Sequence, residues 1–342
     1  MAQKIEFGLD TFGDVTAGPD GQLQTHAVVI REVIEQAVLA DQLGIEAFGV
    51  GEHHRPDFAA SAPEIILTAI GGCTKRILLG SAVTVLSSDD PVRVFERFST
   101  LNAASSGRAE ITVGRGSFTE SFPLFGFDMR QYETLFEEKL DLFVALIRNE
   151  TITWTGTTRS PLTNQRVFPP LEGELKTWIG VGGSPESVVR AARYDLPLML
   201  AIIGGDPKRF TPYVDLYHRA FVQLGKPVKP IGLHSHGYVA DTDAQARDEL
   251  WPHHKAMRDR IGAERGWPPA TRAHFDSEAD GGSLYCGSPE TVARRIATTA
   301  KALGIARFDM KYSSGTLPHD KLTRSIELYG TKVIPMVREM LG

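Results

Sequence analysis

The sequence predicts an α/β fold, a (β/α)8 TIM barrel with insertions at the carboxyl-terminal face of its strands. Short apolar runs alternate with amphipathic stretches along the 342 residues, which is typical of strands and helices built on a parallel sheet. Eight such units favour a closed barrel over an open sheet. The main rival is an open dinucleotide-binding sheet. It needs a Gly-rich turn after the first strand, where this chain has Asp10-Thr-Phe-Gly-Asp.

The individual elements follow from apolar periodicity and from helix-capping residues. We expect strands at residues 5–9, 47–51, 77–85, 109–113, 177–181, 196–203, 231–239 and 307–312. Helices are expected at 25–43, 63–71 and 207–224, around 136–147, and from residues 91, 185, 289 and about 318. Gly44 is the expected left-handed cap of the first helix, and Asp90 and Pro91 open the third. A Gly-Ser-Pro-Glu string occurs at 183–186 and again at 287–290, where each serine is expected to cap a helix.

Composition excludes several classes of protein. The formal net charge is −5, from 37 basic and 42 acidic residues without a basic block, which argues against nucleic acid or an anionic membrane as the main partner. The two cysteines, Cys73 and Cys286, match neither the pattern of a disulfide framework nor that of a zinc ligand set. No apolar run reaches the length of a membrane span, and the N-terminus lacks the features of a signal peptide. We therefore expect a cytoplasmic protein.

The length of the chain predicts an elaborated mouth rather than a second domain. A bare barrel needs about 250 residues, which leaves roughly 90 for insertions. They fall mainly at 11–24, 115–128, 150–176 and 241–284. Three of these segments follow strands and belong to the carboxyl-terminal face, whereas 150–176 starts at the opposite face. We expect one domain over residues 1–342, with its longest insertion at 241–284.

In a barrel of this kind the functional residues follow the carboxyl ends of the strands. Glu52, His53 and His54 come directly after the second strand, where an imidazole can donate, accept or shuttle a proton. The competing interpretation is a buried histidine that only satisfies the core. Because neighbouring side chains on an extended backbone point in opposite directions, one histidine of the pair should face the mouth, and we favour His53.

Two further segments could bind an anion. Arg115 lies between two glycines after the fourth strand, where it could clamp a phosphate or could be a surface arginine in a mobile loop. Residues 182–187 join a strand to a helix N-terminus, whose free N–H groups favour an anion. The second copy of this string, at 287–291, could serve only as a helix cap. From the residues alone, either copy could be the anion site.

Two histidine pairs have mainly structural interpretations. His234 and His236 could offer two metal ligands on one face of the seventh strand. Metal-dependent barrel hydrolases also carry histidines on the first strand, which this chain lacks, so pocket lining or packing is favoured. His253 and His254 lie in the polar insertion and are expected on a solvated helix face.

Three blocks of the sequence together resemble the bacterial luciferase-like flavin-dependent monooxygenases, over residues 5 to about 335. The first is Glu52-His53-His54. The second and most specific runs from Gly80-Ser-Ala-Val-Thr-Val-Leu through Asp90-Pro-Val-Arg-Val and Ser106-Gly-Arg to Gly114-Arg115-Gly116. The third pairs Gly183-Ser-Pro-Glu-Ser with Gly315-Thr-Leu-Pro-His319 and Ser325-Ile-Glu-Leu.

The resemblance implies a flavin that lies across the carboxyl-terminal mouth of the barrel. His53 resembles a histidine near the flavin ring, and Glu52 beside it is the second catalytic candidate. The implied cofactor-binding residues are Ala82, Val83, Thr84, Gly114, Arg115, Gly182, Gly183, Ser184, Ser187, Ala201 and Ile202. Arg115 and residues 182–187 would hold the phosphate, which favours the first copy of the cap string. A cis Ala82–Val83 peptide is expected. Luciferase has a reactive cysteine where this chain has Gly114, so light emission is not implied.

The implied activity is that of a two-component monooxygenase, in which reduced FMN and O2 oxygenate a small organic substrate. A separate flavin reductase would supply the reduced FMN, and a homodimer is the usual assembly of the family; no metal is implied. Three alternatives stay open: a hydride-transfer oxidoreductase that uses the deazaflavin F420, a non-catalytic flavin-binding protein, and a metal-dependent barrel hydrolase. The F420 branch usually reads Asp-His-Phe where this chain has Glu52-His53-His54, which favours FMN.

Overall fold

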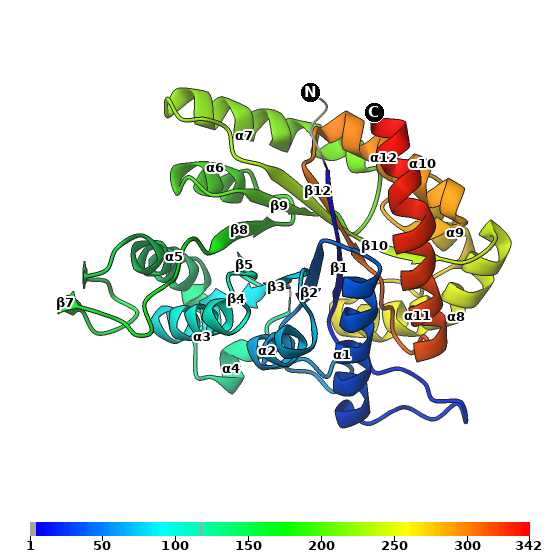
Figure 1. Cartoon of the computed structure of the whole chain (residues 1–342), viewed down its shortest axis with the longest axis horizontal. Helices are drawn as coiled ribbons and strands as arrows, with labels where there is room; N and C mark the ends of the chain where they lie inside the picture. The colour runs from blue at the N-terminus through cyan, green and yellow to red at the C-terminus, as the bar shows by residue number, and fades with distance from the viewer. Residues whose placement is uncertain (1–4, 117) are drawn as a thin grey trace.

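The computed structural model describes residues 5–116 and 118–342, and its centre is a closed parallel barrel (Figure 1). The barrel strands are β1 (Glu6–Thr11), β2 (Ala47–Val50), β3 (Leu78–Ser81), β5 (Ala109–Gly114), β8 (Lys176–Val181), β9 (Leu198–Ala201), β10 (Ile231–Val239) and β12 (Arg307–Lys311). Each strand pairs with the next in this order, and β12 pairs with β1 to close the ring. The predicted (β/α)8 class is confirmed.

Helices surround the ring of strands in Figure 1. The α-helices of the barrel units are α1 (His26–Gln42), α2 (Pro63–Cys73), α3 (Pro91–Ala104), α5 (Tyr132–Arg148), α6 (Pro185–Arg193), α7 (Thr211–Gln223), α10 (Pro289–Leu303), α11 (His319–Leu328) and α12 (Ile334–Leu341). Short helical turns are η1 (Leu86–Ser88), α4 (Ser121–Leu124), η2 (Met129–Gln131), η3 (Pro207–Phe210) and η4 (Tyr329–Val333). In the described part of the chain, no helix has the length and apolar character needed to cross a membrane.

The helix starts lie where the capping residues predict them. The Asp90 side chain accepts hydrogen bonds from the backbone N–H groups of Val92 and Arg93, and Ser184 and Ser288 cap α6 and α10 in the same way. Gly44 adopts the expected positive φ of 77° just after α1. These features depend on a few adjacent residues, so the sequence alone locates them.

The structure differs from the sequence expectation in two places. The single strand expected at 77–85 is broken into β3 and β4 (Thr84–Val85), and the cis Ala82–Val83 peptide lies between them. The insertions also contain regular structure: the antiparallel pair β6 (Ile152–Trp154) and β7 (Leu162–Gln165), which was not expected, the helix α8 (Asp243–Arg265), which carries the expected helical His253 and His254, and the helix α9 (Arg272–Gly281). Strand β11 (Tyr285–Gly287) follows the last of them. The segment 241–284 is therefore largely helical.

The barrel interior below the mouth is charged. Arg307 on β12 binds Glu110 on β5 through Nη1 and Oε1 at 2.6 Å, and its Nε lies 2.8 Å from Oδ1 of Asp309. Burial raises the pKa of Asp309 to about 6. Glycines make room for these groups, since a Cβ at Gly8 would lie 2.1 Å from Oδ1 of Asp309. These charged residues line the inner end of the cavity at the mouth, and we call this part of the lining the polar floor.

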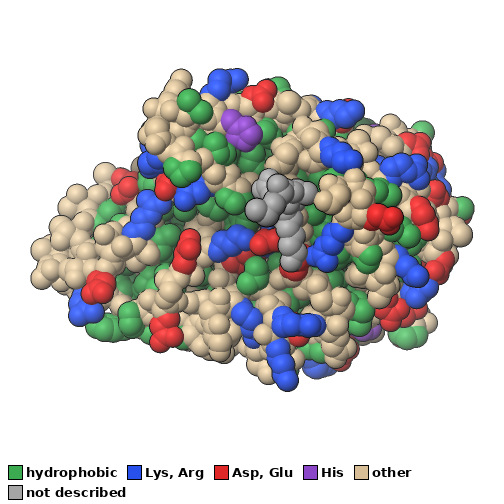
Figure 2. Space-filling model, turned by 45° about the horizontal axis from the view of Figure 1, so that its top comes forward, with side chains coloured by type: hydrophobic (Ala, Val, Ile, Leu, Met, Phe, Trp, Pro, Cys, Tyr) green, Lys and Arg blue, Asp and Glu red, His purple; other side chains and the backbone are tan. Residues whose placement is uncertain are grey.

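Acidic and basic side chains are interspersed over the face of the molecule in Figure 2, without a patch of one sign. This distribution agrees with the nearly balanced charge of the sequence, −5 in total. On this face the surface offers no large basic field of the kind that attracts nucleic acid.

Candidate active site

A cavity of about 410 Å³ opens at the carboxyl-terminal mouth of the barrel. Most residues predicted for the site line it: Glu52, His53, Ala82, Val83, Gly114, Arg115, Gly182, Ser187 and Ala201. Residues that follow five different strands therefore meet in one space. The remaining four predicted residues, Thr84, Gly183, Ser184 and Ile202, do not line the cavity but lie next to residues that do.

Each of those four residues makes an identifiable contact behind the wall. The hydroxyl of Thr84 donates to that of Ser81 at 2.8 Å, and Ser184 caps α6. The carbonyl of Gly183 accepts a hydrogen bond from the Tyr213 hydroxyl at 2.8 Å. Ile202 is fully buried, and the next residue, Ile203, reaches the cavity instead.

One wall of the cavity is the Ala82–Val83 segment, whose peptide bond is cis as expected. The carbonyl of Val83 accepts a hydrogen bond from the N–H of Glu52 at 3.1 Å, and the Glu52 carboxylate accepts from the N–H of Val85 at 2.8 Å. Two glycines leave room for the Val83 side chain, because a Cβ at Gly114 would lie 2.8 Å from its Cγ2 and one at Gly180 would lie 3.2 Å from its Cγ1. Glu52 and the two glycines thus set the position of this segment.

We expect Gly114→Ala to lower the free energy of unfolding by about 1–3 kcal/mol, because the new methyl group must displace Val83 from a packed position. Gly182→Ala is the matched control, since a Cβ there would meet no atom within 4 Å. Urea unfolding of the three proteins measures the effect. Equal stabilities for the two variants would show that Gly114 does not hold Val83 in place.

His53 lies in an aromatic cage. Its ring centroid is 4.5 Å from that of Phe12, 4.6 Å from that of Phe58 and 5.0 Å from that of Phe118. Its Nδ1 is 3.9 Å from Oε1 of Glu120, too far for a hydrogen bond, and has no other partner among the described residues. Burial lowers the pKa of His53, although Glu120 opposes the shift. The ring is therefore neutral near pH 7, with one nitrogen free toward the cavity.

The expectation that only one histidine of the pair faces the mouth is wrong. His54 also lines the cavity, and its Nε2 lies 2.9 Å from Oε1 of Glu52. The physical reason is that β2 ends at Val50, so the alternation of an extended strand does not continue through residues 52–54. His54 and the N–H of Val85 together occupy the Glu52 carboxylate, which suits Glu52 to positioning.

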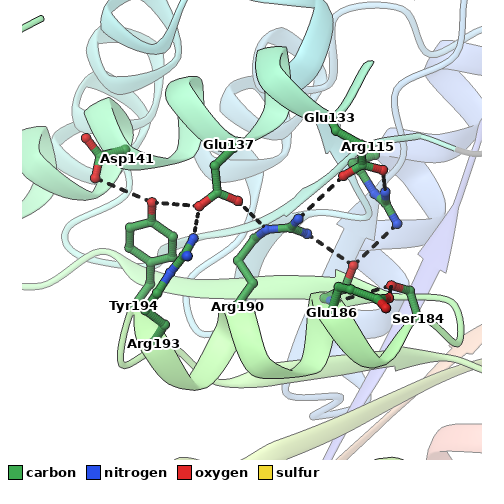
Figure 3. Close-up of polar contacts among 10 residues, drawn as sticks. Arg115, Glu133, Glu137, Asp141, Ser184, Glu186, Arg190, Arg193 and Tyr194 are labelled. Atoms are coloured by element: carbon green, nitrogen blue, oxygen red, sulfur yellow. Dashed lines mark hydrogen bonds and ion pairs between the residues drawn. The ribbon is translucent and has the colours of Figure 1, made fainter. Parts of the chain in front are cut away.

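Arg115 lines the cavity, and it and Arg190 both lie within hydrogen-bond distance of one hydroxyl. Nη2 of Arg115 lies 3.3 Å and Nη1 of Arg190 lies 3.2 Å from Oγ of Ser187. Figure 3 shows the carboxylates of α5 that balance them: Glu133 pairs with Arg115, and Glu137 binds Nε of Arg190 at 2.6 Å. Sequence reasoning missed Arg190, although its place one turn after Ser187 on α6 could have revealed it.

The two copies of the Gly-Ser-Pro-Glu string have different surroundings in the structure. The first copy lies beside Arg115 at the N-terminus of α6. At the second copy, the carboxylate of Asp243 already occupies the N-terminus of α10, accepting hydrogen bonds from the N–H of Ser288 at 2.6 Å and the hydroxyl of Thr291 at 3.0 Å. A second anion is disfavoured there, whereas at the first copy Arg115 lies beside the start of the helix, although the Glu186 carboxylate accepts a hydrogen bond from the Ser184 hydroxyl at 2.7 Å.

The histidines of β10 belong to the polar floor. Nδ1 of His234 lies 2.7 Å from Oδ2 of Asp10, and both His234 and His236 line the cavity. Within residues 5–116 and 118–342, no group of three or more His, Cys, Asp or Glu side chains is arranged to hold a metal ion. The interpretation of this pair as pocket lining is confirmed.

Helix α8 covers part of the cavity, and the solvated face expected for His253 and His254 is wrong. His254 lines the cavity, and Nδ1 of His253 lies 2.8 Å from the hydroxyl oxygen of Thr316. The cavity-facing residues of α8 are His254, Met257, Arg258, Ile261 and Arg265, and their spacing of three and four residues marks one helix face. The sequence shows the spacing of these residues, but their mixed polarity does not indicate that this face of the helix is buried.

Acidification should destabilise the protein through His254. Burial, followed by the charge of Arg258, lowers the pKa of His254 from 6.5 to about 4. Between these values the unfolded chain binds a proton that the folded chain does not, so stability present above pH 6.5 is lost as the pH falls toward 4. The expected loss from this residue is on the order of 1–3 kcal/mol.

The variant His254→Gln isolates this contribution. Urea unfolding at several pH values should show that the natural protein loses more stability than the variant as the pH falls from 6.5 toward 4. Burial also lowers the pKa of His53 and of His236, so the variant keeps part of the acid sensitivity. Parallel stability curves for the two proteins would contradict the assignment to His254.

Comparison with known proteins gives matches along nearly the whole chain. The uncharacterized protein y4vJ of Sinorhizobium fredii is 25% identical over 96% of this chain and 97% of its own. The N-acetyl-S-alkylcysteine monooxygenase of Bacillus subtilis is 28% identical over 53% of each chain.

Solved structures match the fold. A monooxygenase of Streptomyces bottropensis, RslO1, superposes with a TM-score of 0.82 at 22% identity over 97% of this chain and 99% of its own. The oxygenating constituent of 3,6-diketocamphane monooxygenase of Pseudomonas putida, solved with FMN, has a TM-score of 0.78 at 17% identity, covering 97% and 98%. An F420-dependent secondary alcohol dehydrogenase has a TM-score of 0.77 at 16% identity, covering 98% and 99%. The family model of luciferase-like monooxygenases matches residues 7–307, and this chain therefore belongs to that family.

Proposed function

We propose that this chain is a monooxygenase that uses reduced FMN and O2 to oxygenate a small organic substrate. The observation that carries the proposal is one cavity whose lining combines two features. Arg115 and Ser187 at the start of α6 suit a phosphate, and a neutral, caged His53 suits proton handling.

The residues present fit FMN. Its phosphate would bind at Arg115, Ser187 and the N–H groups that open α6, where Gly182 leaves the space above the backbone empty. Its ring would lie against the Ala82–Val83 segment and Ala201, which line the same cavity. When bound and reduced, FMN supplies the electrons that activate O2.

The side chains around that space would exclude water and manage one proton. Phe12, Phe58 and Phe118 surround His53 and keep its ring away from solvent. The free Nδ1 of His53 can hold or release a proton at the cavity wall. Glu52 would act as a positioning residue, since its carboxylate fixes His54 and the backbone after Val83.

A second candidate function is hydride transfer with the deazaflavin F420. The F420-dependent alcohol dehydrogenase favours it, since its fold matches about as well as that of the FMN-bound monooxygenase, with TM-scores of 0.77 and 0.78. Binding of FMN, riboflavin and F420 to the purified protein, followed by fluorescence, separates the two. We expect FMN to bind most tightly, and binding of F420 alone would overturn the proposal.

The reaction itself is tested with chemically reduced FMN, isotopically labelled O2 and a panel of small organic substrates. We expect one oxygen atom from O2 in the product, detected by mass spectrometry. If every substrate class yields only hydrogen peroxide, a non-catalytic flavin-binding protein becomes the better account. We further propose that the chain acts as one cytoplasmic domain, forms a homodimer and receives reduced FMN from a separate reductase.

A further inference from the structure

A second, smaller chamber opens off the main cavity beneath α8 and α9. Its volume is about 100 Å³, against about 410 Å³ for the main cavity. Ile203, His236, His254 and Arg258 line both spaces, so the two adjoin each other at these side chains. The chamber exceeds the space that one water molecule needs, about 10–15 Å³, yet it is too small for the body of an organic substrate. Its size suits one functional group.

The polar groups at the junction lack partners. Nδ1 of His236 and Nδ1 of His254 are buried and make no hydrogen bond to any described residue. Burial lowers the pKa of both rings, and the nearby cations Lys311 and Arg258 lower it further. Both imidazoles are therefore neutral near pH 7, and a neutral imidazole can offer an N–H donor. Buried polar atoms without partners are rare in folded proteins and need an explanation.

One arginine, Arg258, and one carboxylate, Glu278, are the charged residues of the described chamber lining. Arg258 stacks over the ring of Trp267 at 4.6 Å and has no carboxylate partner among the described residues. Glu278, the carboxylate of the described lining, accepts hydrogen bonds from the N–H groups of Gly205 at 2.9 Å and Ser283 at 3.0 Å. Lys311 is neutralised by Asp14 at 2.6 Å. Arg258 thus lines both spaces and forms no ion pair within 4 Å with a carboxylate of the described residues.

We propose that this chamber binds the carboxylate group of the substrate, with Arg258 as its counter-ion and His236 and His254 as hydrogen-bond donors. The inference rests on the proposed function, since it names the substrate class of the same site. A planar carboxylate matches the fork of a guanidinium group, and a charged partner strengthens each hydrogen bond. The rest of the substrate would remain in the main cavity, against Met257 and Ile261.

Calorimetry on the full chain without flavin tests this subsite with phenylacetate and its neutral analogue phenylacetamide. We expect phenylacetate to bind about tenfold more tightly or better. Arg258→Gln should abolish the preference, and Arg258→Lys should keep part of it. The matched control is Arg260→Gln, two residues further along α8, where the arginine pairs with Asp57 at 3.0 Å outside both cavities.

Equal affinity of the natural protein for the acid and the amide overturns the proposal. So does an unchanged preference in Arg258→Gln, or tighter binding of phenylmethanesulfonate, which would indicate a tetrahedral anion. Thermal unfolding shows whether each variant is folded. Because no flavin is present, the carboxylate preference can hold even if FMN fails to bind, and oxygenation with FMN can hold without the preference.

Discussion

Arg115→Ala is expected to weaken FMN binding by about 10- to 100-fold, while riboflavin binding changes by less than about threefold. The two flavins differ only in the phosphate, and Arg115 lies where Ser187 and the N-terminus of α6 can bind it. Removing the guanidinium also takes away one of the two arginines that balance the Glu133 carboxylate, which keeps only Arg190 at 3.5 Å, and this adds repulsion toward the phosphate. Fluorescence titration of the natural protein and the variant with both flavins measures the effect.

Ser288→Ala is the control for this prediction. Ser288 caps α10 as Ser184 caps α6, but the carboxylate of Asp243 occupies its helix N-terminus. The variant should lose some stability, about 1 kcal/mol, and keep its flavin affinity. Equal losses of FMN and riboflavin affinity in Arg115→Ala would remove Arg115 from the phosphate site.

His53→Gln is expected to leave FMN affinity within about threefold and to lower the rate of substrate oxygenation by about 100-fold or more. Glutamine keeps hydrogen-bonding capacity in the cage of Phe12, Phe58 and Phe118 but cannot exchange a proton near pH 7. Electrons from reduced FMN should then appear mainly as hydrogen peroxide. Parallel assays of product and peroxide, run across a range of pH, measure this change.

The control variant is His218→Gln on α7, which lies outside the cavity. It should leave both the product yield and the pH profile unchanged. The pH profile of the natural enzyme should show a titration that the His53→Gln profile lacks. A fall in FMN affinity that matches the fall in oxygenation rate would indicate a structural role for His53.

Local signals in the sequence located the barrel and half of the site. Asp90, Ser184 and Ser288 cap helices through contacts within three residues, so their helices start where the sequence predicts. Glu52, His53 and Arg115 follow apolar strands directly, and the barrel rule places the ends of all strands around one mouth. For these residues, the neighbouring sequence and the fold class are sufficient to predict the position in the structure.

The other half of the site depends on contacts between distant segments. Helix α8 reaches the mouth of the barrel, and no pattern within 241–284 shows that His254 and Arg258 face β10 across the cavity. The break after Ser81 reflects the packing of Val83 against Gly114 and Gly180 from two other strands. Such features arise from tertiary packing, which overrides local propensity.

A crystal structure of the protein soaked with FMN would locate the cofactor. We expect FMN in the cavity at the barrel mouth, with its phosphate between Arg115, Ser187 and the N-terminus of α6 and its ring against Ala82 and Val83. A phosphate at Ser288, or FMN outside this cavity, would contradict this expectation.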